Sequence, residues 1–289
     1  MMLRFLTVLF ALGVATFCPA IVSAQSSPAP AVPAASPSPS PAPNPIGPAF
    51  GANDPCTSIA AIVTRPSVTN SVCTVRPNHV EVETGYQNMT LDGGGNAVSY
   101  PQTLIRIGTA IPALEFDIAP PQISRTSGGG MTTIGSTDVG AGLKYVFGYT
   151  PKFNYGGQVF FTAPTGTNGA SAGGTTASYA LNAGYTLSPV FSLAGTVTAQ
   201  SQTNGAQRWS ALASSLVLGV SLPNATGLNA EIAQFSHAVG PGTPTRTQYL
   251  LAAYRGVGPR IQLDTSYALS PTTATGKYHY VGFGASFYF

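Results

Sequence analysis

The residues of this sequence that could do chemistry are charged side chains at alternate positions among apolar ones. Glu115 and Asp117, for example, alternate with Leu114, Phe116 and Ile118. In an extended strand this spacing puts the carboxylates on one face and the apolar groups on the other. Charges gathered on the inner faces of several strands can pair with one another or form a selective ring. The candidates for such a lumen lining are Glu81, Glu83, Arg106, Glu115, Asp117, Asp138, Lys144, Glu231, Arg260 and Asp264.

The sequence does not indicate catalysis. His79, His237 and His279 lie in no nucleophile motif, and Ser236 precedes His237 in a strand-like stretch, where neighbouring side chains point to opposite faces. The stretch 140–144 has two glycines before a lysine but lacks the full spacing of a phosphate-binding loop. There is also no His or Cys cluster at metal-ligand spacing. We therefore expect no enzyme activity, no metal and no cofactor.

Export is indicated by the N-terminus. Arg4 precedes an apolar run from 5 to 17, and small residues end the segment at Ala24, as in a signal peptide covering residues 1–24. A retained anchor is the alternative, although the run is shorter than the roughly 20 residues that span a bilayer. A lipoprotein at Cys18 is a further alternative, but Phe17 stands where that processing requires a small residue.

The two remaining cysteines, Cys56 and Cys73, would then lie in an oxidising compartment, which favours a disulfide between them over two free thiols. They belong to a short segment, residues 51–78, which we expect in the periplasm and which is too small for a core of its own. It could plug or cover the mouth of the following domain. The Pro, Ala and Ser-rich residues 25–50 before it predict a disordered spacer, which could equally be a passive leader.

Composition restricts the class of protein. Only 7% of residues are charged, against about 25% in soluble domains, while 44% are hydrophobic. No basic run is present, so nucleic acid is not an expected partner. No stretch after the N-terminal run is long and apolar enough for a transmembrane helix. If the chain spans a membrane, it must do so with strands.

From residue 79 the pattern is one of alternation, with segments of the 9 to 11 residues that a tilted membrane strand needs. The predicted strands lie near 79–91, 98–110, 113–123, 138–149, 154–164, 176–187, 190–201, 209–221, 226–238, 246–256, 259–269 and 277–289. Tight turns at 111–112, 149–152, 188–189, 222–226 and 256–258 alternate with longer links, notably 124–137 and 164–175. This asymmetry is typical of outer-membrane barrels.

The last strand carries a second indication. Phe283, Phe287 and Phe289 share one face with Val281 and Ala285, and Phe289 ends the chain. A terminal strand of this kind resembles the signal by which the barrel assembly machinery recognises its substrates. We therefore predict an all-β fold: a transmembrane antiparallel up-and-down β-barrel of about twelve strands over residues 79–289, with a disordered N-terminal extension. A soluble β-sandwich is the competing fold.

Three stretches carry a family resemblance: DVGAGLKYVF at 138–147, VFFTAPTG at 159–166 and YTLSPVFSLAG at 185–195. They resemble an outer-membrane family of transporters linked to the meta-pathway of phenol degradation, although Ala163 stands where that family usually has leucine. The resemblance covers residues 81–289. It implies a barrel for uptake of aromatic or other hydrophobic compounds and carries over no binding residue.

The sequence therefore predicts a porin-like channel in the outer membrane of a Gram-negative bacterium, with its N-terminal extension in the periplasm. Small solutes, including aromatic or hydrophobic ones, would pass passively through a narrow lumen. The alternative is a structural or surface-binding barrel with a closed lumen. The expected partners are outer-membrane lipid, the assembly machinery and a small solute.

Overall fold

A computed structural model describes residues 54–289 apart from 168, 239 and 272–275. The predicted signal peptide, residues 1–24, and spacer, residues 25–50, lie outside the described residues. One short helix, α1 (Ile59–Ile62), precedes fifteen strands. These are β1 (Val80–Leu91), β2 (Gly95–Tyr100), β3 (Leu104–Gly108), β4 (Leu114–Ala119), β5 (Ile123–Gly128), β6 (Met131–Ser136), β7 (Val139–Tyr149), β8 (Phe153–Ala163), β9 (Thr176–Thr186), β10 (Phe191–Thr203), β11 (Arg208–Leu222), β12 (Thr226–Phe235), β13 (Arg246–Gly256), β14 (Ile261–Ser270) and β15 (Tyr278–Tyr288). Among the described residues, no helix is long and apolar enough to cross a bilayer.

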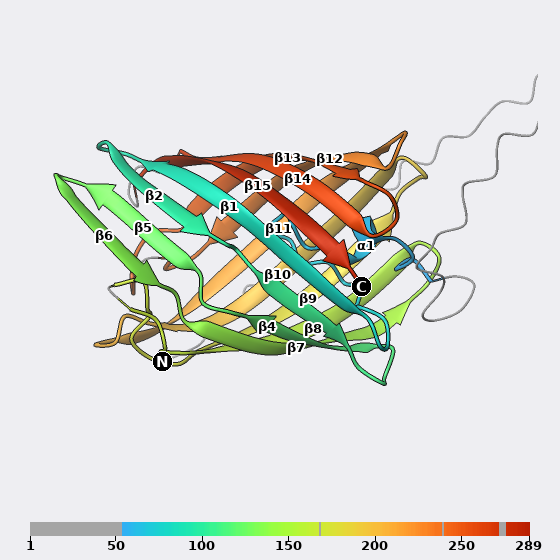
Figure 1. The fold of residues 1–289 in the computed structure, drawn as a ribbon, viewed down its shortest axis with the longest axis horizontal. Helices are drawn as coiled ribbons and strands as arrows, with labels where there is room; N and C mark the ends of the chain where they lie inside the picture. The colour runs from blue at the N-terminus through green and yellow to red at the C-terminus, as the bar shows by residue number, and fades with distance from the viewer. Residues whose placement is uncertain (1–53, 168, 239, 272–275) are drawn as a thin grey trace, which may run out of the picture. The chain divides into compact units, whose positions relative to one another are not determined.

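The strands form one antiparallel sheet that closes on itself, because β15 pairs with β14 on one side and with β1 on the other (Figure 1). Three successive pairs, β2 with β3, β4 with β5, and β6 with β7, each act as one interrupted strand, which leaves twelve around the ring. Closure gives the strands of the ring a hydrogen-bonding neighbour on both sides, as a sheet in lipid requires, except that β6, in the hairpin at one end, pairs within the described residues with β5 alone. The closed twelve-stranded barrel confirms the predicted fold class.

The interruptions correct part of the sequence prediction. The predicted strands 98–110 and 113–123 are each broken, at Pro101 and at Pro120-Pro121, because proline has no N–H to donate to a neighbouring strand. The predicted long link 124–137 is also wrong. Most of it forms the hairpin of β5 and β6, in which Ile123 pairs with Ser136 and Gly128 with Met131.

The two faces of the wall follow the alternation. Large apolar side chains stand exposed on the outside, while the side chains between them are buried inside the ring. Members of this outer belt include Leu143, Phe147, Phe161, Leu181, Leu212, Leu251, Leu263 and Phe283. An outer surface with so many exposed apolar side chains is more stable against lipid tails than against water, as in a membrane-spanning barrel.

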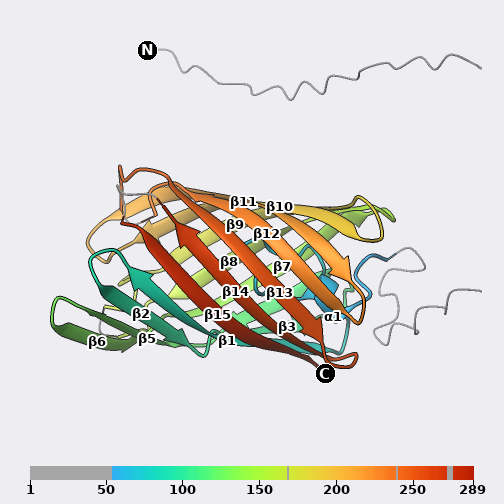
Figure 2. The same cartoon turned by 90° about the horizontal axis from the view of Figure 1, so that it is seen from above.

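The two ends of the barrel differ. We call the end that holds His79, Phe289 and the turns at 109–113, 150–152, 187–190, 223–225 and 257–260 the short-turn end. The opposite end, the long-loop end, carries the link 164–175 and the β5–β6 hairpin, drawn in green in Figures 1 and 2. Both views place α1 within the ring near the short-turn end.

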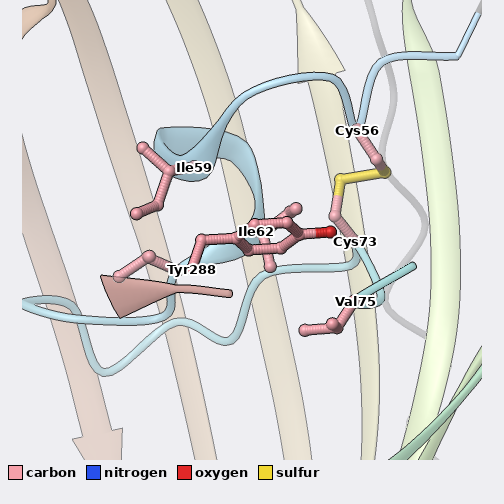
Figure 3. Close-up of a cluster of buried hydrophobic side chains, with 7 residues drawn as sticks. Cys56, Ile59, Ile62, Cys73, Val75 and Tyr288 are labelled. Carbon is pink, nitrogen blue, oxygen red and sulfur yellow. A yellow bond between two sulfur atoms is a disulfide. The ribbon is translucent and has the colours of Figure 1, made fainter. Parts of the chain in front are cut away.

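Residues 54–78, which we call the plug, lie inside the barrel at the short-turn end. A disulfide joins Cys56 to Cys73, with an S–S distance of 2.08 Å. Around it Ile59, Ile62 and Val75 form a small buried cluster, which Tyr288 of β15 joins from the wall (Figure 3). The plug is therefore cross-linked internally by its disulfide and packed against β15, the last strand of the barrel.

Candidate functional site

A buried network of charges lies where the plug meets the wall. The Arg106 guanidinium is completely buried, and its Nε lies 2.9 Å from Oε1 of Glu115, while its Nη1 lies 3.2 Å from Oε1 of Glu83. Glu81 and Asp117 lie 3.8 and 4.0 Å from the same group. Lys144 adds a second cation, 3.3 Å from Glu115. Buried charges are tolerated when they are paired in this way.

Strand register explains why these side chains meet. Glu81 of β1 lies directly opposite Arg106 of β3, which in turn lies opposite Asp117 of β4. In the next row Glu115 faces Lys144 of β7. Side chains directly opposite one another on the same face of a sheet are neighbours. A two-residue alternation in four separate strands is therefore converted into one three-dimensional cluster.

The wall carboxylates also hold the plug by its backbone. The N–H groups of Thr64 and Arg65 each donate to Glu83 at 2.9 Å, and that of Val75 donates to Glu115 at 2.5 Å. In the reverse direction, Arg106 donates to the carbonyl oxygens of Ile62 and Cys73. Hydrogen bonds to charged groups contribute more than neutral ones, roughly 1.5–3 kcal/mol each. The wall thus satisfies backbone groups that the plug, having little secondary structure, leaves unpaired.

The tip of the plug, residues 65–69, crosses the lumen. Its N-terminal side is held at β1 by Glu83, as described above. On its other side the N–H groups of Val68 and Thr69 donate to Glu231 of β12, at 2.9 and 2.6 Å. The Asn229 amide also donates to the Ser67 hydroxyl at 3.1 Å. The tip is therefore fixed at both walls.

A cavity lies on each side of the tip. One, of about 240 Å³, reaches turn residues Lys152 and Thr186 at the short-turn end and is lined also by Asn70 and Asn229. The other, of about 230 Å³, lies toward the long-loop end and includes Gln87, Gln102, Ser266 and Tyr280 among its lining residues. Arg65 and Ser67 line both cavities. The tip is consequently the partition between them.

Beyond the second cavity the lumen becomes apolar. Leu250, Ala252, Ala268, Tyr278 and Tyr280 form a buried cluster on β13 to β15, and Met89 and Leu91 of β1 pack against it. We call these seven residues the tyrosine cluster. The rings of its two tyrosines stack 6.5 Å apart, and Gln248 accepts a 2.7 Å hydrogen bond from the Tyr278 hydroxyl. The five core members are at most 9% exposed, so they fill the inside of the barrel at this level mainly with carbon.

Two glycines of β7 make room for an aromatic ring of the neighbouring strand β8. A Cβ at Gly140 or Gly142 would overlap the ring of Phe160, whose position in β8 faces the lumen. Glycine therefore makes room for an inward aromatic ring, and the stretch 140–144 is part of a strand.

Most of the predicted lumen residues lie inside the barrel, at the plug. Glu81, Glu83, Arg106, Glu115, Asp117 and Lys144 form the charge network, Glu231 holds the tip, and Asp264 contacts Arg65. Arg260 does not line the lumen. It is exposed in the turn before β14, one residue too early for the alternation of that strand to turn it inward.

Asp138 also lies away from the charge network, just before β7 at the long-loop end. Its carboxylate accepts backbone hydrogen bonds from Gly166 and Ala172, both at 2.9 Å, so it fixes the link 164–175. Partial burial alone would raise the pKa of Asp138. Hydrogen bonds from the Ser171 hydroxyl and the link's amides outweigh it and lower that pKa.

The remaining candidates from the sequence, three phenylalanines and three histidines, lie outside the charge network. Phe283, Phe287 and Phe289 alternate on the outer face at the short-turn end, where Phe289 is 63% exposed. His79 stacks on Tyr288, His237 lies in a link after β12, and His279 lies on the outer face near Tyr267. Within the described parts of the chain, no three His, Cys, Asp or Glu side chains come together as metal ligands.

Two functional features were not predicted from the sequence. The inward tyrosines had a readable signal, because Tyr278 and Tyr280 alternate out of phase with the outward Val281 and Phe283. Arg65 had none, since it lies in the plug, where no periodic pattern indicates which way a side chain points.

Comparison with known proteins supports the fold. No protein-family model matches the chain, and no curated relative does. Among solved structures, an outer membrane channel from Pseudomonas putida F1 is similar, with a TM-score of 0.59 and 14% identity, over 77% of this chain and all of that one. At this identity the likeness concerns the fold alone.

Two further structures have TM-scores below 0.5. The KdgM porin in complex with disordered oligogalacturonate scores 0.48 at 9% identity, over 71% of this chain and 98% of that one. The CymD monoaromatic hydrocarbon channel scores 0.42 at 9% identity, over 74% and 88%. Geometry and comparison together place the described chain among twelve-stranded barrels with the fold of an outer-membrane channel.

Proposed function

We propose that this protein is an outer-membrane channel that passes small hydrophobic or aromatic solutes through a lumen closed by its plug. The observation that carries the proposal is the nature of the occlusion. The path is blocked by a terminal segment, with a cavity on each side of its tip, and not by side chains of the wall alone. Because the plug precedes β1, it can move without breaking any strand pairing.

The lining of the lumen supports the solute class. The tyrosine cluster and Phe160 offer carbon and ring faces in the long-loop half, which favour planar apolar solutes over sugars. The carboxylates of the other half are engaged with the plug, so they are not arranged for a polar solute. The resemblance to transporters linked to phenol degradation agrees with this solute class.

The membrane and the orientation are part of the same proposal. The outer apolar belt needs lipid, and the outward aromatic residues of β15, with Phe289 exposed at the short-turn end, suit recognition by the barrel assembly machinery. Short turns and both ends of a barrel usually lie on the periplasmic side. We therefore place the N-terminal extension in the periplasm and the β5–β6 hairpin outside the cell.

A flux measurement tests the channel. The mature protein is reconstituted in liposomes, and entry of an aromatic acid such as benzoate is compared with entry of a sugar of similar mass. A second sample lacks residues 26–78, and a mobility shift on boiling confirms that each barrel is folded. We expect faster benzoate entry than sugar entry, and a larger flux without the plug. No flux from either sample would refute the proposal.

A second function is favoured by the strength of the anchoring. Glu83, Glu115 and Glu231 all hold plug backbone, which suits a permanently closed barrel with a structural or surface-binding role. In that case the full-length protein would carry no solute under any condition. A folded variant without the plug would conduct nonspecifically or not at all.

A further inference from the structure

Arg65 reaches from the plug tip to the seam between the first and last strands. Its Nη1 donates to Oε1 of Gln102 at 2.9 Å, and its Nη2 donates to the carbonyl oxygen of Phe283 at 3.1 Å. The same Nη2 lies 3.4 Å from Oδ1 of Asp264. The guanidinium therefore contacts the link after β2, β15 and β14 at once.

Two glycines make the space that this group occupies. Gly85 of β1 and Gly284 of β15 lie directly opposite each other in the register, on the inner face. A Cβ at either glycine would overlap the Arg65 guanidinium, well inside van der Waals contact. Neither glycine has a positive φ, so the strand backbone itself would accept alanine. At Gly85 the need for glycine comes from Arg65, while at Gly284 an added Cβ would also lie 2.7 Å from Oδ2 of Asp264.

We propose that Arg65 is the positioning residue that latches the plug tip in the closed position, with Gly85 and Gly284 as its seat. Release of this one side chain removes the contacts of the guanidinium with the seam and so weakens the closed position. The backbone hydrogen bonds to Glu83 and Glu231 must also break before the two cavities that the tip separates can join. The inference rests on the proposed channel function and adds the element by which the channel is held shut.

Burial distinguishes Arg65 from the structural arginine of the lumen. The Arg106 side chain is fully buried, and its loss would leave several carboxylates unpaired. The Arg65 side chain keeps 16% of its surface exposed, toward the cavities that it lines. A group at the edge of a cavity can exchange some of its partners for water, whereas a fully buried one cannot. Release of Arg65 would nevertheless leave the fully buried Asp264 side chain without this cation, so the contact with Asp264 favours the closed position.

Glycine substitutions test the latch without changing Arg65 itself. In planar bilayers, Gly85→Ala and Gly284→Ala should each raise the ratio of open to closed time about tenfold or more, because several hydrogen bonds are lost together. Gly282→Ala is the matched control. It lies on the same face of β15, and its Cβ would meet the Ser266 hydroxyl instead of Arg65. It should behave as wild type.

A double substitution separates the latch from general damage to the wall. Arg65→Gln should open the channel as much as Gly85→Ala does, and adding Gly85→Ala to Arg65→Gln should have no further effect. A folded barrel is confirmed for every variant by its mobility shift on boiling. Additive effects would overturn the proposal, because the glycine would then matter for a reason other than its contact with Arg65.

The plug-deleted barrel distinguishes failure of the latch from failure of the channel. If it conducts while Gly85→Ala, Gly284→Ala and Arg65→Gln all remain closed, the latch is refuted and the channel stands. If the folded, plug-deleted barrel is silent, both proposals fall. Opening in the three latch variants and not in Gly282→Ala supports the latch.

Discussion

The two halves of the lumen are built on opposite plans. At the short-turn end the wall presents charged groups, and every one of Glu83, Glu115 and Glu231 contacts plug backbone. At the long-loop end strands β1, β13, β14 and β15 present the tyrosine cluster. The alternation along the strands does not distinguish the two halves, because both sets of side chains lie on the inner face. The halves differ in that the charged one contacts the plug.

The difference indicates what the charges are for. Backbone N–H groups without partners are costly to bury, and a plug with one short helix has many of them. Wall carboxylates satisfy them from the side, as a neighbouring strand would in a sheet. The charged half is therefore primarily a binding site for the protein's own segment, while the apolar half is the part that the proposed function assigns to a solute.

The largest effect should follow from removing the central cation. Arg106→Met leaves Glu81, Glu83 and Glu115 with too little positive charge, and loss of one partner in a buried network costs about 3–5 kcal/mol. The free energy of unfolding, measured by urea titration in detergent micelles, should fall by that amount. Arg260→Met, at an exposed turn, should change it by less than about 0.5 kcal/mol. Equal losses for the two variants would contradict a charge network centred on Arg106.

A smaller effect, limited to the plug, should follow from removing the disulfide. Cys56 and Cys73 are 17 residues apart, and closing a loop of that size contributes about 3 kcal/mol. In the double variant Cys56→Ser with Cys73→Ser, hydrogen exchange should speed up over residues 54–78 and remain unchanged in β10 to β12 at the long-loop end. Acceleration in both regions would show that the plug and the wall unfold together.

The apolar half can be tested by giving it a charge. Ala268→Asp places a carboxylate in the tyrosine cluster, where Ala268 is fully buried. Entry of benzoate, whose charge slows its passage through the lipid itself, should slow by about tenfold, equivalent to 1.4 kcal/mol at the barrier. Leu263→Asp on the outer face is a poor control because it would face lipid, so Ala268→Asn, which adds a side chain of similar size without a charge, serves instead. Wild-type entry rates in Ala268→Asp would argue against a path along the cluster, and equal slowing by both variants would assign the effect to volume and not to charge.

The smallest effect concerns pH at the long-loop end. Burial acts to raise the pKa of Asp138, but the hydrogen bonds from the link 164–175 lower it below its ordinary value. A lowered folded pKa means that its contribution is complete above the ordinary Asp value of about 3.9 and is lost as the pH falls through the folded pKa. The protection factors of the link's amides, which correct for the slower intrinsic exchange in acid, should fall over that acid range. In Asp138→Asn the same protection factors should be low already at neutral pH, with little further change on acidification.

Much of the wall could be predicted because its residues repeat with a period of two. Val281, Phe283 and Ala285 give the outer face of β15, and the same rule applied to Glu115 and Asp117 gives their place inside. The breaks at Pro101 and Pro120 were missed because the flanking alternation continues across them. Register then brings Glu81, Arg106 and Asp117 together, although no local pattern specifies it.

The plug could not be predicted to the same degree. Its contacts run from backbone amides to side chains far away in the sequence, as from Val68 to Glu231, and backbone amides leave no mark in a sequence. Nothing in the sequence around Gly85 and Gly284 marks them as special, and their closeness to Arg65 is visible only in the structure. Long-range contacts of a segment without periodicity have to be seen in the structure.

The position of the Arg65 seat on the β1–β15 seam has a consequence for assembly. The first and last strands of the barrel can pair only after the whole chain has been made and the ring is ready to close. Gly85 and Gly284 come together in that same event, so the place that holds the plug tip is completed by the pairing that completes the wall. If the latch operates as proposed, the first ring that could admit solutes is also the first that can hold the plug tip at this seat.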